Sequence, residues 1–261
     1  IADVTHIDPL VGTMEDLDRL IKEAADRCKG LMFYMVFNHT STQHEWFARA
    51  LKGEKEYQDY YIFRKGKKGF LPTNWQSKFG GSAWEYVEEL GQYYLHLFDR
   101  TQADLNWENP KVREEIRMVL LVWKKKGIRG FRFDVIKLIS KPAYFEDDDE
   151  GDGRRFYTDG PRVHEYLKEM NEKVISRFDW MTVGEGAGAG VEDAKRYAGT
   201  NENELDMIFT FEHVNLGQTQ YGTWSDGSFD LVELKKVFQK WEDGLEGVAW
   251  NSLYWDNHDQ P

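Results

Sequence analysis

Helix-like and strand-like patterns alternate along most of this chain, and this alternation limits the possible folds more than any other feature. From residue 110 onward, the predicted helices lie at about 110–126, 160–177, 190–198 and 230–242. The predicted strands lie between or after them, at about 128–135, 180–184, 207–211 and 248–255. Upstream, a helix pattern at about 13–28 precedes an apolar strand at 30–37. Such alternation is typical of a parallel sheet covered by helices.

The helix at 110–126 is the one whose ends are best marked. Asn109 is a favourable N-terminal cap, and Pro110 suits the first helical position because its missing N–H has no intrahelical partner there. Lysines gather in the last turn, and Gly127 is a typical residue just past a helix end.

Residues 40–108 interrupt the alternation. This stretch is rich in Trp, Tyr, Gly and short polar turns, and we interpret it as a lid subdomain inserted after a barrel strand. The predicted organisation is therefore a barrel part at 1–39, a lid at 40–108 and a continued barrel part at 109–261.

Polar residues lie at or just after the end of each predicted strand. These are Asn38 and His39, Asp134, Glu185, Glu212 and His213, and finally Asn257, His258 and Asp259. In a (β/α)8 TIM barrel, the C-terminal ends of the strands build the active site. Because only five strands are predicted where eight are needed, we expect an α/β fold that is an incomplete barrel in this chain. The absence of an initial Met also suggests that the true start lies upstream.

The segment "GFRFDVI" at 130–136 contains two charges inside an otherwise apolar strand. Side chains alternate between the faces of a strand, so Arg132 and Asp134 share one face while Phe131 and Phe133 share the other. The charged pair is predicted to point into the barrel mouth, although a purely structural buried ion pair is the alternative.

Two carboxylates in a pocket with histidines and aromatic rings suit the cleavage of glycosidic bonds. Arg132 would stabilise the charged Asp134 that a nucleophile requires. Neighbouring carboxylates would raise the pKa of Glu185, as an acid requires. A metal hydrolase that uses His39, Asp134, His258 and Asp259 is the best alternative from another class, although no closely spaced His pair supports it.

Composition excludes several other classes. A net charge of -12 argues against a nucleic-acid partner. No apolar run approaches the roughly 18 residues of a membrane span, which argues against a membrane protein. A single cysteine excludes an internal disulfide and favours a reducing, cytoplasmic setting. The "GEGAGAG" run at 184–190 departs from the dinucleotide-binding pattern, because Ala189 stands where its last Gly would be.

Five ordered motifs resemble the conserved regions of glycoside hydrolase family 13, the α-amylase family. They are "VFNH" (36–39), "QADLNW" (102–107), "GFRFDVI" (130–136), "VGE" (183–185) and "NHDQP" (257–261). The similarity is greatest to the family's oligo-1,6-glucosidase, α-glucosidase and trehalose-6-phosphate hydrolase group. Three features depart from that group: Tyr34 replaces the usual Asp, Lys137 replaces the usual Asn, and a Gly/Ala run at 186–190 follows Glu185.

The resemblance implies a role for each matching residue. Asp134 resembles the catalytic nucleophile, Glu185 the acid/base, and Asp259 the third carboxylate that stabilises the transition state. His39 and His258 resemble hydrogen-bond donors to the sugar, and Arg132 the partner of the nucleophile. Val135 is implied to contact substrate and to favour α-1,6 linkages, because relatives that act on α-1,4 linkages tend to have Thr or Ala there.

The resemblance thus implies a retaining, exo-acting α-glucosidase that acts on α-1,6 or α-1,4 linkages of short oligosaccharides. No cofactor and no metal are expected, the partner is an oligosaccharide substrate, and the oligomeric state is open. Trehalose-6-phosphate hydrolysis is an alternative activity. A catalytically silent sugar-binding or interaction module is the alternative from another class, and the truncated chain alone is expected to be marginally stable or inactive.

Overall fold

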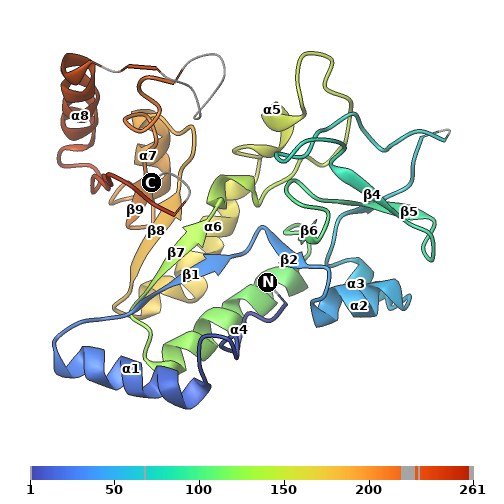
Figure 1. Ribbon diagram of the computed structural model, residues 1–261, viewed down its shortest axis with the longest axis horizontal. Helices are drawn as coiled ribbons and strands as arrows, with labels where there is room; N and C mark the ends of the chain where they lie inside the picture. The colour runs from blue at the N-terminus through green and yellow to red at the C-terminus, as the bar shows by residue number, and fades with distance from the viewer. Residues whose placement is uncertain (1, 68, 219–226, 229, 259–261) are drawn as a thin grey trace.

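A parallel four-stranded sheet forms the centre of the fold. The computed structural model describes residues 2–67, 69–218, 227–228 and 230–258 (Figure 1). The sheet consists of β1 (Met32–Val36), β7 (Gly130–Asp134), β8 (Met181–Glu185) and β9 (Met207–Phe209), in the spatial order β1-β7-β8-β9. Each strand is parallel to its neighbour, so all four C-terminal ends lie at one edge of the sheet.

Helices connect these strands, as the alternating pattern predicted. They are α1 (Met14–Asp26), α4 (Pro110–Lys126), α6 (Val163–Lys173), α7 (Val191–Ala198) and α8 (Leu231–Leu245). Shorter helical turns lie at Ile136–Leu138, Arg154–Tyr157 (α5) and Ile175–Arg177. No helix in the described part of the chain is long and apolar enough to cross a membrane.

The predicted ends of α4 are confirmed. The side chain of Asn109 accepts a hydrogen bond from the Lys111 backbone N–H at 2.9 Å, and Pro110 is the first helical residue. Gly127 has a φ of 104°, in the left-handed region that glycine adopts without strain, and it ends the helix. The buried face of α4, which includes Ile116 and Leu120, joins the same hydrophobic core as Phe131 and Phe133 of β7.

The strand predicted at 248–255 is wrong. In this segment, one parallel bridge joins Ser252 to Phe209, and one antiparallel bridge joins Ala249 to Gly199. The Tyr254 carbonyl accepts a hydrogen bond from the His213 ring at 2.6 Å, so part of the backbone pairs with a side chain instead of a strand. Trp250 and Trp255 are 72% and 68% exposed, so these aromatic residues do not indicate a buried strand. In the described residues, the parallel sheet thus has four strands, whereas five were predicted.

The segment at 40–108 forms small antiparallel sheets and short helices. Its elements, together with the strand that begins at His39, are β2 (His39–Ser41), α2 (Glu45–Leu51), α3 (Lys55–Gln58), β3 (Phe63–Arg64), β4 (Trp84–Val87), β5 (Gln92–Leu95) and β6 (Gln102–Asp104). β2 pairs with β6, and β3, β5 and β4 form a three-stranded sheet. These elements lie to one side of the parallel sheet (Figure 1). Their status as a separate lid subdomain stays a prediction.

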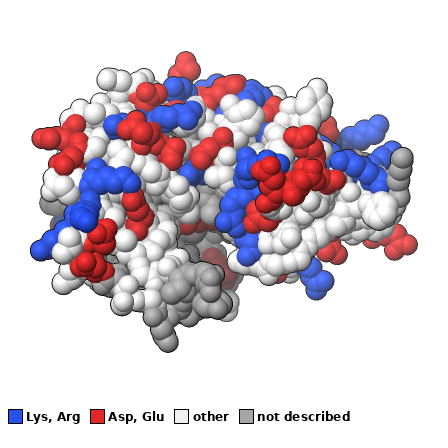
Figure 2. All heavy atoms as spheres, turned by 90° about the horizontal axis from the view of Figure 1, so that it is seen from above, with Lys and Arg blue, Asp and Glu red and all other residues white. Residues whose placement is uncertain are grey.

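A second, smaller hydrophobic core is formed mainly by residues of this segment. Trp75, Trp84, Leu95, Leu97 and Tyr157 pack together there and are almost fully buried. Because Tyr157 belongs to α5, this core anchors the loop after β7 to residues of the 40–108 segment. Seen from the side toward which β7 and β8 point, the surface is hollowed near its middle, and acidic side chains lie inside the hollow (Figure 2).

Candidate active site

Asp134 and Glu185 are the last residues of two neighbouring parallel strands. In the register of β7 and β8, Arg132 lies opposite Val183 and Phe133 opposite Gly184, so both carboxyl side chains are at the same edge of the sheet. The two-residue alternation of β7 is confirmed, because Phe131 and Phe133 are fully buried while Arg132 and Asp134 lie partly exposed on the other face. The strand therefore carries its two charges on the partly exposed face, away from the buried phenylalanines.

Arg132 connects the two carboxylates. Its Nη1 donates to Oδ1 of Asp134, and its Nη2 lies 3.1 Å from Oε2 of Glu185. The three side chains are only 13%, 14% and 12% exposed, respectively. One guanidinium thus partly neutralises the negative charge of two largely buried carboxylates, whose desolvation would otherwise be unfavourable.

Val135 provides a further link between the strands. Its backbone N–H donates to Oε2 of Glu185 at 2.9 Å. Val135 has a φ of 39°, which is left-handed and unusual for a β-branched residue. Such strained backbone occurs at functional sites where the surrounding structure holds it in place. Here the turn directs an N–H group at the Glu185 carboxyl.

The surroundings of Glu185 favour its protonated form. Burial, together with the adjacent Asp134 carboxyl, raises the pKa of Glu185 to about 7, although the Val135 N–H and Arg132 act in the opposite direction. A carboxyl with this pKa can give up and recover a proton near neutral pH. Asp134, by contrast, accepts hydrogen bonds on Oδ1 from both Arg132 and Tyr34.

The two predicted histidines differ in burial and in their partners. His39 is 3% exposed, and its Nε2 lies 3.0 Å from Nε2 of Gln102. Burial lowers the pKa of His39, which favours the neutral ring. His258 is exposed, and its ring meets the Tyr34 ring edge-on at a centroid distance of 5.9 Å. Asp259 lies outside the described residues.

A buried polar network that was not predicted supports His39. The ammonium of Lys141 lies 2.7 Å from Oδ2 of Asp104 and donates to Oδ1 of Asn38 and to the Leu138 carbonyl, each at 2.6 Å. Asn38 also donates to Asp104 at 3.0 Å. This network joins the end of β1, the end of β6 and the loop after β7, so it fixes the residue that precedes His39.

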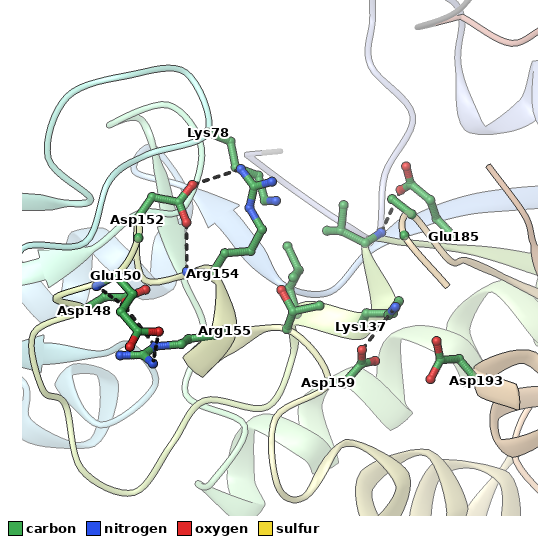
Figure 3. Close-up of a pocket in the computed structure, with 16 residues that line it drawn as sticks. Lys78, Lys137, Asp148, Glu150, Asp152, Arg154, Arg155, Asp159, Glu185 and Asp193 are labelled. Carbon is green, nitrogen blue, oxygen red and sulfur yellow. Dashed lines mark hydrogen bonds and ion pairs between the residues drawn. The ribbon is translucent and has the colours of Figure 1, made fainter. Parts of the chain in front are cut away.

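A cavity of about 700 Å³ opens beside Glu185 and Val135. Figure 3 shows Glu185 at one end and a group of basic side chains toward the other. Arg154 lies 3.0 Å from Asp152, Arg155 lies 2.9 Å from Asp148, and Lys137 lies 3.1 Å from Asp159. Sequence reasoning noted Lys137 only as a departure from the family. It did not find Arg154 and Arg155, because no local pattern shows that α5 lines the same cavity as Glu185.

The alternative of a metal hydrolase gains no support. Within the ranges that the structure describes, no three His, Cys, Asp or Glu side chains are grouped so that they could hold a metal ion. Asp134 instead accepts hydrogen bonds from Arg132 and Tyr34. The two ring nitrogens of His39 lie within hydrogen-bond distance of the Gln102 and Asn38 side chains.

Comparison with known proteins agrees with this geometry. The sequence profile described as "Alpha amylase, catalytic domain" matches residues 1–261. The chain is 51% identical to the trehalose-6-phosphate hydrolase of Bacillus subtilis and 47% identical to the oligo-1,6-glucosidase of Bacillus cereus. Each match covers 100% of this chain, but only 47% and 48% of those relatives.

Solved structures show the same similarity. The crystal structure of the Bacillus licheniformis trehalose-6-phosphate hydrolase superposes with a TM-score of 0.97 at 50% identity, over 100% of this chain and 48% of that one. The chain therefore spans about half the length of these relatives, and its parallel sheet with covering helices is part of their barrel. From the profile match and these identities, the chain belongs to the α-amylase family, glycoside hydrolase family 13.

Proposed function

We propose that the protein containing this chain is a retaining, exo-acting α-glucosidase for short oligosaccharides. The observation that carries the proposal is the placement of Asp134 and Glu185 at the ends of adjacent strands, with Arg132 between them. Neighbouring strands are about 4.8 Å apart, which suits the roughly 5–5.5 Å between carboxyl groups that retaining enzymes require.

The proposed reaction has two displacements. An Asp134 oxygen attacks the anomeric carbon while the bond to the leaving oxygen breaks, and Glu185 gives that oxygen its proton. Water then attacks the same carbon, Glu185 takes a proton from the water, and the bond to Asp134 breaks. Each step inverts the anomeric centre, so the configuration is retained overall. No cofactor takes part in either step.

Other residues are assigned by the family resemblance. We assign the binding of sugar hydroxyls to His39 and His258, and stabilisation of the transition state to Asp259. Arg132 is assigned the role of partner of the nucleophile, to which it donates a hydrogen bond. The single cysteine is consistent with a cytoplasmic protein. Release of glucose from isomaltose and from an aryl α-glucoside by the full-length protein tests the activity, and no release would favour a silent sugar-binding or interaction module.

The pKa of Glu185 predicts the pH dependence of the first step. Glu185 must be protonated to act as an acid, and its pKa is about 7. As pH rises through 7 the protonated fraction falls, so kcat/KM on isomaltose should decrease about tenfold for each pH unit well above 7. Rates measured from pH 5 to 9 check this. A flat profile up to pH 9 would contradict the role of Glu185.

Val135 predicts a preference for α-1,6 linkages. Its branched apolar side chain lines the cavity beside Glu185 and offers no hydroxyl for hydrogen bonding. Small steric and polar differences in such pockets change kcat/KM by roughly 10- to 200-fold. We expect isomaltose to be hydrolysed at least about tenfold faster than maltose, in kcat/KM, and Val135→Thr to narrow the difference. Faster hydrolysis of maltose by the wild-type protein would refute this prediction.

Hydrolysis of trehalose 6-phosphate is the second candidate, and the basic part of the cavity favours it. Lys78 lies beside Arg154 (Figure 3). Lys78 is exposed to solvent, but partial desolvation and the nearby Arg154 charge both lower its pKa. Among the described residues, no carboxylate lies within ion-pair distance of Lys78, so it could bind a phosphate. Two similar proteins are named trehalose-6-phosphate hydrolase.

A substrate panel separates the two candidates. If the second is correct, trehalose 6-phosphate should be hydrolysed much faster than trehalose, and Lys78→Gln should selectively reduce that difference. Lys65→Gln is a matched control, because Lys65 is an exposed lysine outside the cavity. Equal rates of hydrolysis of trehalose and trehalose 6-phosphate would exclude trehalose-6-phosphate hydrolysis as the function.

A further inference from the structure

Tyr34 occupies an unusual position in the site. It lies on β1 directly opposite Arg132 of β7, and its hydroxyl donates a hydrogen bond to Oδ1 of Asp134. Since Asp134 follows Arg132 by two residues, the phenol extends along the sheet toward the strand ends, where the chemistry is proposed to occur. The side chain is not part of the apolar core, because Tyr34 is 47% exposed.

One cation and one neighbouring ring hold the orientation of Tyr34. The guanidinium carbon of Arg132 lies 4.1 Å from the centre of the Tyr34 ring, which is a favourable cation–π distance. The His258 ring meets the same ring edge-on at 5.9 Å. Burial and the hydrogen bond to Asp134 both raise the pKa of Tyr34, so its hydroxyl keeps its proton and remains a donor.

Tyr34 and Arg132 both donate to the same oxygen of Asp134. Nη1 of Arg132 and the hydroxyl of Tyr34 converge on Oδ1. A carboxylate whose Oδ1 is held by two donors cannot rotate freely, and Oδ2 is then the oxygen available for a sugar. Preorganisation of this kind reduces the reorganisation needed to reach a transition state.

We propose that Tyr34 is a positioning residue for the nucleophile Asp134, and that its hydroxyl assists mainly the second displacement. This inference rests on the proposed glucosidase function. In the second displacement, the bond between the anomeric carbon and Oδ2 breaks and its electron pair returns to Asp134. The Tyr34 hydrogen bond to Oδ1 strengthens as that negative charge develops, so it favours departure of the carboxylate. In the first displacement, the Tyr34 hydrogen bond makes the attacking carboxylate less nucleophilic. This loss offsets the benefit that the fixed orientation of the carboxylate brings.

Tyr34→Phe tests this inference, because it removes the hydroxyl and keeps the ring on Arg132. Loss of a hydrogen bond to a charged group lowers the rate of the step that it assists by roughly 10- to 100-fold. With an aryl α-glucoside, whose first step is fast, we expect kcat and KM to fall together by about tenfold or more while kcat/KM changes by less than about threefold. A burst of aryl alcohol equal in amount to the enzyme should accompany this, because the glucosyl-enzyme accumulates.

Tyr144→Phe is the matched control, because Tyr144 is 87% exposed and lies outside the cavity. It should leave kcat, KM and the burst unchanged. Unchanged kinetics of Tyr34→Phe would overturn the inference, and so would a loss in kcat/KM at constant KM without a burst. A wild-type protein that hydrolyses no α-glucoside would overturn the proposed function and this inference together, whereas an active wild type with an unaffected Tyr34→Phe variant would overturn the inference alone.

Discussion

Asp134→Asn in the full-length protein is expected to lower kcat by about 10⁴-fold or more, the scale seen when a covalent nucleophile is removed. The amide has no negative charge with which to attack the anomeric carbon. Its size and its contacts with Arg132 and Tyr34 are similar, so the fold and the binding of sugar should survive. Steady-state rates on isomaltose and calorimetric titration with a slowly hydrolysed sugar measure the two effects separately.

A control shows whether the loss is specific to this carboxylate. Asp179→Asn makes the same chemical change at a side chain that is 95% exposed and pairs with Arg129. It should leave kcat within about twofold of the wild type, as expected for a surface substitution. If Asp134→Asn retained more than a tenth of the wild-type kcat, Asp134 would not be the nucleophile.

Glu185→Gln is expected to separate substrates by their leaving groups. Removal of a general acid typically costs about 10²- to 10⁴-fold, and isomaltose should show this loss because its leaving oxygen needs a proton. An aryl glucoside with an acidic leaving group should keep its first step, and the glucosyl-enzyme should then accumulate because no base activates water. Burst kinetics on the aryl substrate measure this directly.

Added azide tests the second half of the role of Glu185. Azide is a nucleophile that needs no general base, so it should restore turnover of the aryl substrate by Glu185→Gln and yield α-glucosyl azide. The variant should also lose the decrease in kcat/KM above pH 7. An equal loss on isomaltose and on the aryl substrate, with no effect of azide, would remove Glu185 from the role of acid/base.

The main geometry of the site could be predicted from the sequence because it depends on short-range periodicity. The alternation along 130–134 placed Arg132 and Asp134 on one face, and the order of strands and helices placed Glu185 on the next strand. A parallel sheet brings the ends of neighbouring strands to one edge, so both carboxylates had to meet there. The cap residues of α4 likewise act within a few positions of each other.

Features that depend on long-range contacts could not be predicted in this way. Lys141 joins Asn38 and Asp104, which lie far away along the chain, and no local pattern signals that network. The aromatic residues at 248–255 suggested a strand by composition, but Trp250 and Trp255 are exposed and only Ser252 bridges to β9. Tyr34 was visible as a departure from the family, yet only the structure shows its contact with Asp134.

The configuration of the first glucose released tests the central claim most directly. If Asp134 forms a covalent intermediate and Glu185 assists both steps, hydrolysis of isomaltose or an aryl α-glucoside by the full-length protein should release α-glucose first. Proton NMR of the anomeric signals, recorded before mutarotation equilibrates them, distinguishes the two forms. Early α-glucose is the result that this account predicts, and β-glucose as the first product would contradict double displacement and the role of Asp134.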